Sequence, residues 1–129
     1  MSRDRLGVGF VGAGFNAQFH IRSWVGVRCA DVLGIVSRDR AEDAAALARS
    51  LGVGEAQAYD TITDMVADPA IDAIWICAPN FTRLEVREEI VEAIESGQGE
   101  LVGVACEKPL GRNAAEARRM LELVERAGL

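Results

Sequence analysis

The sequence predicts an α/β protein built on a doubly wound parallel sheet, with helices on both faces in three layers. Two observations lead to this fold class. Short, nearly continuous apolar runs alternate with helical patterns along all 129 residues, which is typical of a parallel sheet covered on both faces. Clusters of glycine, proline and asparagine follow several of these runs, where such a sheet binds ligands. We therefore expect one domain over residues 1–129.

Five apolar runs are predicted to be strands. They are Leu6–Val11, Val32–Val36, a short run near Tyr59, Ala73–Cys77 and Leu101–Cys106. The first strand is followed by a helix from Phe15 to about Val25. Asp39, with Glu42 three residues later, predicts the N-cap of an alanine-rich helix that ends at Gly52.

Three further helices begin at side chains that favour the N-cap position. The predicted caps are Thr61, Thr82 and Asn113. The last two each have a glutamate three residues later, which is the capping-box pattern. The predicted ends are Asp68-Pro69, Ser96-Gly97 and Gly128. The charged run from Arg87 to Glu95 is interpreted as a helix face exposed to water.

Composition argues against several classes of function. The net charge is −6, with 14 basic and 20 acidic side chains, so a broad surface for nucleic acid or anionic membrane is not expected. The charged N-terminus precedes only a short strand, which is neither a signal peptide nor a membrane span. Cys29, Cys77 and Cys106 form no CxxC motif or Cys/His cluster. We therefore predict no metal site and a reducing compartment, the cytoplasm.

The turn after the first strand predicts a bound dinucleotide. The hexapeptide GAGFNA follows a strand and begins a helix, which is the context that the G-x-G-x-x-G/A fingerprint requires. Gly12 permits the tight turn, Gly14 lets the backbone approach a pyrophosphate, and Ala17 allows close packing of helix and strand. The helix N-terminus, at Phe15 and Asn16, supplies N–H groups and a positive dipole end. A tight turn without a ligand is the alternative.

The end of the second strand predicts which dinucleotide is bound. An acid there accepts hydrogen bonds from the adenosine ribose, whereas an arginine accommodates a 2′-phosphate. Ser37 stands where the acid is expected, and Arg38 follows it. Because Arg38 can make a charge-assisted bond to phosphate, NADP(H) is favoured over NAD. Asp39 is a competing ribose ligand, and a solvated surface charge is the alternative for Arg38.

Lys108 follows the fifth strand, in the sequence Glu107-Lys108-Pro109. A lysine has three donors and no acceptor, so at a strand end it can bind a substrate oxygen or the nicotinamide ribose and assist proton transfer. Glu107 could hold the lysine or contact the ribose. A surface lysine before a turn proline is the alternative. His20, the one histidine, is interpreted as a packing or capping residue of the first helix.

Three motifs together resemble the glucose–fructose oxidoreductase/inositol dehydrogenase/rhizopine-catabolism family (Gfo/Idh/MocA). GAGFNA is similar to the family's Rossmann fingerprint, Asp68–Asn80 to its DPxIDAVxIxTPN strand, and Glu107–Leu110 to its EKP motif. The resemblance covers essentially all of the chain. It implies that Lys108 is the catalytic-site lysine and that the Lys108-Pro109 bond is cis. The candidate cofactor-binding residues after the fourth strand are Ala78, Pro79 and Asn80, the last two bordering the nicotinamide.

Two features differ from the family pattern. Arg83 stands where the family usually has a histidine, three residues after the asparagine. Arg83 is interpreted either as a ligand for an anionic substrate or a cofactor phosphate, or as the first helical residue facing solvent. Family members also have a C-terminal α/β domain that forms the substrate wall and often the subunit interface. We expect that this domain is absent from the 129 residues.

These observations predict the NAD(P)-binding half of an oxidoreductase that acts on a sugar, cyclitol or similar polyol. Lys108 would assist proton transfer or polarise the substrate oxygen, while the dinucleotide carries the hydride. The expected partners are the dinucleotide, a small polyol or sugar, and a second copy of the chain. One alternative is a stand-alone nucleotide-binding or regulatory module without turnover. Another is a coenzyme A-binding Rossmann domain, which would not need Lys108.

Overall fold

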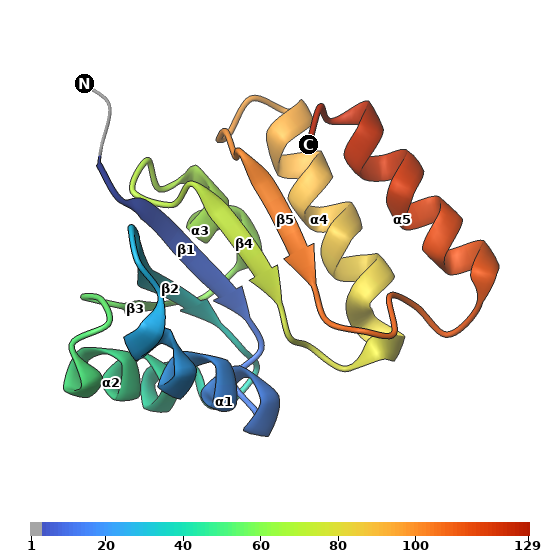
Figure 1. Ribbon diagram of the computed structural model, residues 1–129. Coiled ribbons are helices and arrows are strands. Elements are labelled where there is room, and N and C mark those ends of the chain that lie inside the picture. Colours follow the sequence, from blue (N-terminus) through green and yellow to red (C-terminus); the bar gives the residue numbers. More distant parts are fainter. Residues whose placement is uncertain (1–3) are drawn as a thin grey trace.

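Five parallel strands form one sheet in the computed structural model (Figure 1), which describes residues 4–129. The strands are β1 (Leu6–Val11), β2 (Ala30–Val36), β3 (Gln57–Tyr59), β4 (Ala73–Ile76) and β5 (Gly103–Cys106). Their order is β3-β2-β1-β4-β5. The chain therefore winds outward from β1 in one direction and then returns to continue on its other side. This order confirms the predicted doubly wound Rossmann-type sheet, with its switch point between β1 and β4.

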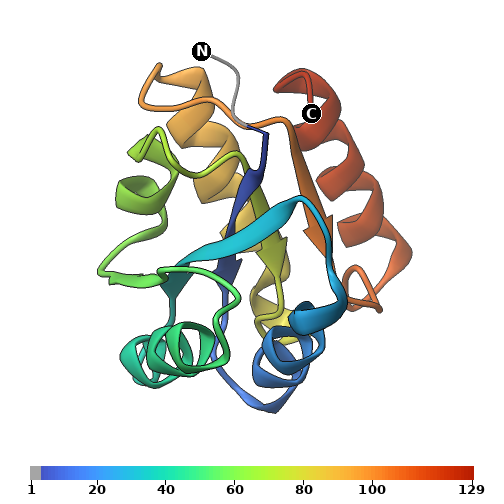
Figure 2. The same ribbon diagram turned by 60° about the vertical axis from the view of Figure 1, so that its left-hand side comes forward.

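Helices cover both faces of the sheet (Figures 1 and 2). The helices are α1 (Phe15–Ser23), α2 (Ala41–Leu51), α3 (Ile62–Ala67), α4 (Arg83–Glu95) and α5 (Ala114–Arg126), with short 3₁₀ turns at η1 (Trp24–Gly26) and η2 (Asn80–Thr82). On one face α1 packs beside α2. On the other, α4 lies between α3 and α5. The predicted three layers are confirmed, and β5 is an edge strand of the described sheet.

Two apolar clusters, one on each face of the sheet, form the core. Successive strand residues point to opposite faces, so Phe10 packs towards α1 and α2 while Val11 packs towards α3 and α4. Ile21 of α1 and Ala48 of α2 join the first cluster, and Ile90 of α4 joins the second. The sheet is thus held from both sides, which keeps the carboxyl ends of its strands together.

Most of the predicted helix boundaries are confirmed. The Thr61 hydroxyl accepts the Asp64 N–H at 3.0 Å, and the Asn113 side chain accepts the Glu116 N–H at 2.9 Å. Gly52 ends α2 in the left-handed conformation, with φ at 69°. None of the helices within residues 4–129 has both the length and the apolar character that crossing a bilayer requires.

Two predicted N-caps differ from the structure: Asp39 is at the wrong position, and Thr82 is at the N-cap position but forms no cap bond. Helix α2 begins at Ala41, so its N-cap is Arg40, whose side chain makes no cap bond, and Asp39 lies one residue too early. Thr82 precedes α4 but already has helical backbone angles, because η2 runs directly into the helix. Its hydroxyl donates to the carbonyl oxygen of Pro79 at 2.8 Å instead of accepting an N–H group of the first turn.

Candidate functional site

The predicted site residues lie together at the carboxyl ends of the strands. The sheet hydrogen bonds continue past these ends: the Gly12 N–H donates to the Val36 oxygen at 2.8 Å, and the Glu107 N–H donates to the Ile76 oxygen at 3.0 Å. The arrowheads of β1, β4 and β5 point in the same direction in Figure 1, so the carboxyl ends of these strands lie at one end of the sheet. The residues that follow these adjacent strands therefore form one site around the switch point.

The glycine turn is tight at Gly12 and open to solvent at Gly14. Gly12 has a φ of +111°, and a Cβ atom there would lie 2.9 Å from the Ala78 nitrogen, so only glycine fits. Gly14 is exposed, and a Cβ atom there would meet nothing within 4 Å. Helix α1 begins directly afterwards, without a side-chain cap bond and without an acid in its first turn. Its first N–H groups, at Phe15 and Asn16, remain available to an anion.

A basic, solvent-exposed segment follows β2. Ser37 is half-buried, while Arg38, Asp39 and Arg40 are exposed. Because Asp39 does not cap α2, its carboxylate is available as the competing ribose ligand. The segment therefore offers both an arginine for a 2′-phosphate and a carboxylate for a ribose.

The segment after β4, Ala78-Pro79-Asn80, is named the PN loop here. Ala78 is buried against the Gly12 turn, Pro79 is exposed, and Asn80 is half-buried at the start of η2. The segment after β5, Glu107-Lys108-Pro109, is named the EKP loop. Lys108 is exposed, and the Lys108-Pro109 bond is cis, as the resemblance implied. Both loops stand at the edge where the glycine turn lies.

Glu107 connects the EKP loop with helix α1. His20 Nε2 donates to Glu107 Oε1, and the Glu107 side chain is only 16% exposed. This bond from His20 lowers the pKa of Glu107, burial opposes the lowering, and Asn16 and the Lys108 N–H add to it. The His20 ring also packs on Trp75, with 4.9 Å between ring centroids.

The predicted packing role of His20 is thus confirmed, but its bond to the EKP loop was not predicted. The sequence contains one indication of this bond, which is the spacing of two residues on α1. Asn16 and His20 are four residues apart, so they lie on the same face of the helix. That face meets the end of β5, which no local pattern indicates.

Arg83 holds the PN and EKP loops together. Its side chain is only 6% exposed, so the interpretation as a residue facing solvent is wrong. The Nε atom donates to the Ala78 oxygen at 2.9 Å, and Nη1 donates to the Glu107 oxygen at 3.0 Å and to the Pro109 oxygen. Backbone carbonyls of both loops thus accept from the Nε and Nη1 atoms of Arg83. The geometry supports a structural clamp at this position.

The comparisons with known proteins agree with this site. Residues 6–129 match the family described as "Oxidoreductase family, NAD-binding Rossmann fold" (GFO_IDH_MocA). The chain belongs to the Gfo/Idh/MocA family. It is an NAD(P)-binding Rossmann domain of that family.

Two relatives and a solved structure match nearly the whole chain. The chain is 34% identical over 122 residues to inositol 2-dehydrogenase of Corynebacterium glutamicum (strain R), covering 94% of this chain and 33% of that protein. It is 29% identical over 126 residues to the rhizopine catabolism protein MocA of Rhizobium meliloti, covering 98% and 35%. An NAD binding oxidoreductase from Klebsiella pneumoniae has 27% identity and a TM-score of 0.74, with 98% and 33% covered. The chain thus spans about a third of the length of these relatives.

A second arginine of this Gfo/Idh/MocA domain is also buried. Arg87 is 7% exposed, which corrects the interpretation of the run from Arg87 to Glu95 as a solvated face; the glutamates at 88, 89, 92 and 95 are exposed. Arg87 Nε has no hydrogen-bond partner within the described part of the chain. Arg87 lies next to Cys106, whose pKa is raised by burial and drawn back towards its ordinary value by this arginine.

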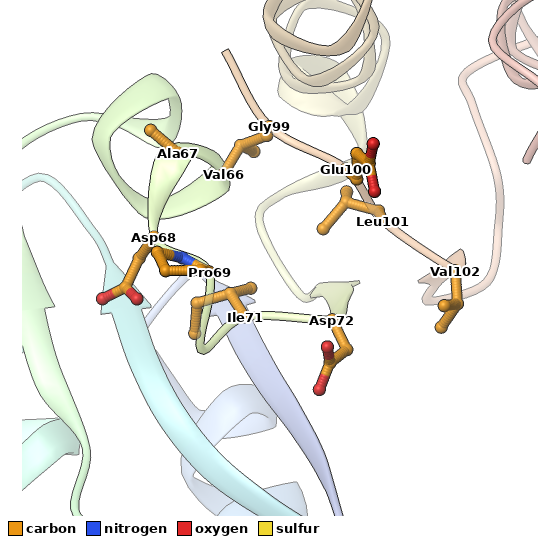
Figure 3. Close-up of a pocket in the computed structure, with 10 residues that line it drawn as sticks. All are labelled: Val66, Ala67, Asp68, Pro69, Ile71, Asp72, Gly99, Glu100, Leu101 and Val102. Atoms are coloured by element: carbon orange, nitrogen blue, oxygen red, sulfur yellow. The ribbon is translucent and has the colours of Figure 1, made fainter. Parts of the chain in front are cut away.

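A cavity of about 390 Å³ lies away from the candidate site, at the amino ends of β4 and β5 (Figure 3). Three acids line it: Asp68, Asp72 and Glu100. Asp72 accepts the Gly7 N–H at 2.7 Å, and Asp68 accepts the Tyr59 hydroxyl. These two carboxylates hold the entry to β1 and the end of α3. Within residues 4–129 no three side chains of His, Cys, Asp or Glu gather as a metal would require.

Proposed function

We propose that this domain binds NADP(H) in preference to NAD(H) within an oxidoreductase acting on a sugar, cyclitol or similar polyol. The enzyme would transfer hydride between the nicotinamide and a hydroxyl or carbonyl carbon of that substrate. The observation that carries the proposal is the junction of the fingerprint helix with the EKP loop, where His20 donates to Glu107. The names of two relatives, an inositol 2-dehydrogenase and a rhizopine catabolism protein, support the substrate class.

Lys108 is the proposed catalytic residue. It is the one lysine among 14 lysines and arginines, and an amine can exchange a proton where a guanidinium cannot. In the oxidation direction, the nicotinamide, when bound, would supply the acceptor for the hydride that leaves the substrate carbon. Lys108, as the neutral amine, would accept the hydroxyl proton and become an ammonium group. Pro79 and Asn80, on the neighbouring strand end, would border the nicotinamide ring.

Arg38 carries the proposed preference for NADP(H). No carboxylate stands at position 37, and the Arg38 side chain is exposed beside the N-terminus of α2. We expect Arg38→Ala to weaken NADPH binding roughly tenfold to a hundredfold, the effect of losing one charged hydrogen bond. NADH binding should change little.

Fluorescence titration of the chain with NADPH and NADH measures both affinities. Arg22→Ala, which removes an exposed arginine from the last turn of α1, is the matched control. Equal losses for the two cofactors in Arg38→Ala would contradict the preference. Asp39→Asn tests the competing ribose contact, and a selective loss of NADH binding there would favour NAD instead.

The rival function is a stand-alone nucleotide-binding module without turnover. Both functions require saturable binding of NADPH or NADH, so an absence of binding to either would contradict both. Turnover is tested on the protein at its full natural length, with NADP⁺ and a panel of polyols. Lys108→Met should abolish reduction of NADP⁺ while NADPH affinity stays within about threefold. Oxidation of a polyol by the Lys108→Met enzyme at the unaltered rate would reject the role of Lys108.

The proposal also covers the cellular location and the protein partner of the chain. We propose the cytoplasm, because Cys29, Cys77 and Cys106 are free thiols in the structure and such thiols persist in reducing compartments. A second copy of the chain is the proposed protein partner, since β5 is an edge strand of the sheet formed by residues 4–129, and an edge strand can pair with a further strand. Sedimentation equilibrium tests this, and a strictly monomeric chain would speak against it.

A further inference from the structure

Glu107 is held from three directions within the EKP loop. Its N–H donates to Ile76 of β4, its carbonyl oxygen accepts Arg83 of α4, and its carboxylate accepts His20 of α1. The side chain is 16% exposed. The residue immediately before Lys108 therefore has a single orientation set by three separate elements.

The direction of the bond from His20 is fixed by its ring contacts. The ring lies 4.9 Å from Trp75, and Phe19 meets it edge-on with centroids 6.1 Å apart. The His20 side chain is 22% exposed. These two ring contacts restrict the rotamer of His20, so that Nε2 points to the Glu107 carboxylate.

We propose that His20 is a positioning residue for Lys108, acting through the Glu107 carboxylate. The inference rests on the proposed function and deepens it. His20 lies on α1, whose N-terminus is the proposed pyrophosphate site, while Lys108 follows β5 at the adjacent edge. The bond joins the two halves of the site, so dinucleotide binding at α1 and the orientation of Lys108 are coupled.

Two substitutions separate positioning from packing. His20→Phe keeps an aromatic ring against Trp75 but has no donor for Glu107. His20→Gln loses the ring but keeps an N–H donor at a similar reach. If His20 only packs, His20→Phe resembles the wild type and His20→Gln does not. If it positions Lys108, His20→Gln resembles the wild type and His20→Phe does not.

The composition of the chain makes the readout specific. Lys108 is the one lysine, so reductive methylation with ¹³C-formaldehyde labels its side chain and, apart from it, the N-terminal amine. The labelled methyl signal in a ¹H–¹³C spectrum reports the surroundings of Lys108 directly. It is recorded for each variant without cofactor, with saturating NADPH, and in urea for the unfolded reference.

We expect the Lys108 signal of cofactor-free His20→Phe to move towards its position in the unfolded chain, while His20→Gln stays closer to the wild type. The shift of the Lys108 signal on addition of NADPH should be smaller in His20→Phe than in the wild type by about half or more. This is the expected effect of losing a hydrogen bond to a charged group. Circular dichroism and thermal unfolding check the fold. Should His20→Phe fail to fold, Glu107→Leu takes its place, since it removes the acceptor and leaves the ring contacts.

The outcomes distinguish this inference from the proposed function. A wild-type chain that binds neither NADPH nor NADH contradicts the function, yet the cofactor-free spectra still test the positioning. An unchanged Lys108 signal in folded His20→Phe, or in folded Glu107→Leu, overturns the positioning even if NADPH binds tightly.

Discussion

Arg83 Nη1 donates to the carbonyl oxygen of Glu107 at 3.0 Å, across 24 residues of sequence. The same guanidinium bonds Ala78 and Pro109, so one buried side chain joins the PN and EKP loops. A guanidinium presents several donors in a rigid plane, which lets it serve carbonyls from two loops at once. This arginine holds the segments after β4 and β5 in place.

Arg83→Met should destabilise the chain by about 2–4 kcal/mol, because buried and partly buried carbonyls of the two loops lose their donor. Arg83→Lys should recover less than half of this loss, since one ammonium group cannot reach both loops. Urea unfolding measures the free energies, and Arg118→Met, which removes an exposed arginine of α5, is the control. If Arg83→Lys is as stable as the wild type, a positive charge alone is enough to hold the two loops together.

Gly12→Ala and Gly14→Ala should separate the fold from the ligand site. Gly12 has a positive φ, and an added Cβ would lie 2.9 Å from the Ala78 nitrogen. We therefore expect Gly12→Ala to lose about 1–3 kcal/mol in unfolding free energy. At Gly14 the space is open, so stability should change by less than about 1 kcal/mol while NADPH binding weakens. Unaltered NADPH affinity in Gly14→Ala would place the pyrophosphate elsewhere.

Glu107 makes stability depend on pH in the acidic range. Its folded pKa lies below the ordinary value of 4.5, mainly because His20 donates to it. A lowered folded pKa means that its contribution is fully present above the unfolded pKa and is lost as the pH falls through the folded pKa. The destabilisation caused by Glu107→Gln should therefore shrink as the pH decreases below about 4.5.

Urea unfolding of the wild type and Glu107→Gln over this range gives the difference directly. Glu116, whose pKa is lowered by Arg112, titrates in both proteins and cancels. A difference that stays constant with pH would contradict the bond between Glu107 and His20.

Tyr59 should titrate well above an ordinary tyrosine. Burial first, and then its bond to Asp68, raises the Tyr59 pKa from 10.0 to about 12. It is the one tyrosine, so its ultraviolet absorbance gives the titration without interference from others. A raised pKa contributes stability that is complete below the unfolded pKa and is lost as the pH rises towards the folded value.

Asp68→Asn should lower the Tyr59 pKa towards its unfolded value, whereas Asp60→Asn, at an exposed position, should leave it unaltered. The absorbance change with pH, measured in the folded chain and in urea, checks both expectations. Coincident titrations of folded and unfolded chains would contradict the burial of Tyr59.

The sequence by itself determined the local elements. Apolar runs, glycines and prolines predict the strands and turns because the physical cause lies within a few residues of the effect. The caps at Thr61 and Asn113 were predictable for the same reason, since each side chain accepts an N–H three residues later. The cap bonds at Asp39 and Thr82 were not predictable in this way. Helix α2 begins one residue later than a cap at Asp39 requires, and the 3₁₀ turn η2 gives Thr82 helical backbone angles.

Tertiary structure alone decided the partners of the site residues. His20 meets Glu107 across 87 residues, and Arg83 reaches carbonyls of two loops, because parallel strands bring distant segments to one edge. Arg87 is buried on a helix that packs against α5 and next to Cys106, although its neighbours in sequence are solvent-exposed glutamates. Sequence patterns name the residue types at each strand end. Which of them meet depends on how the strands are ordered and how the helices pack across them.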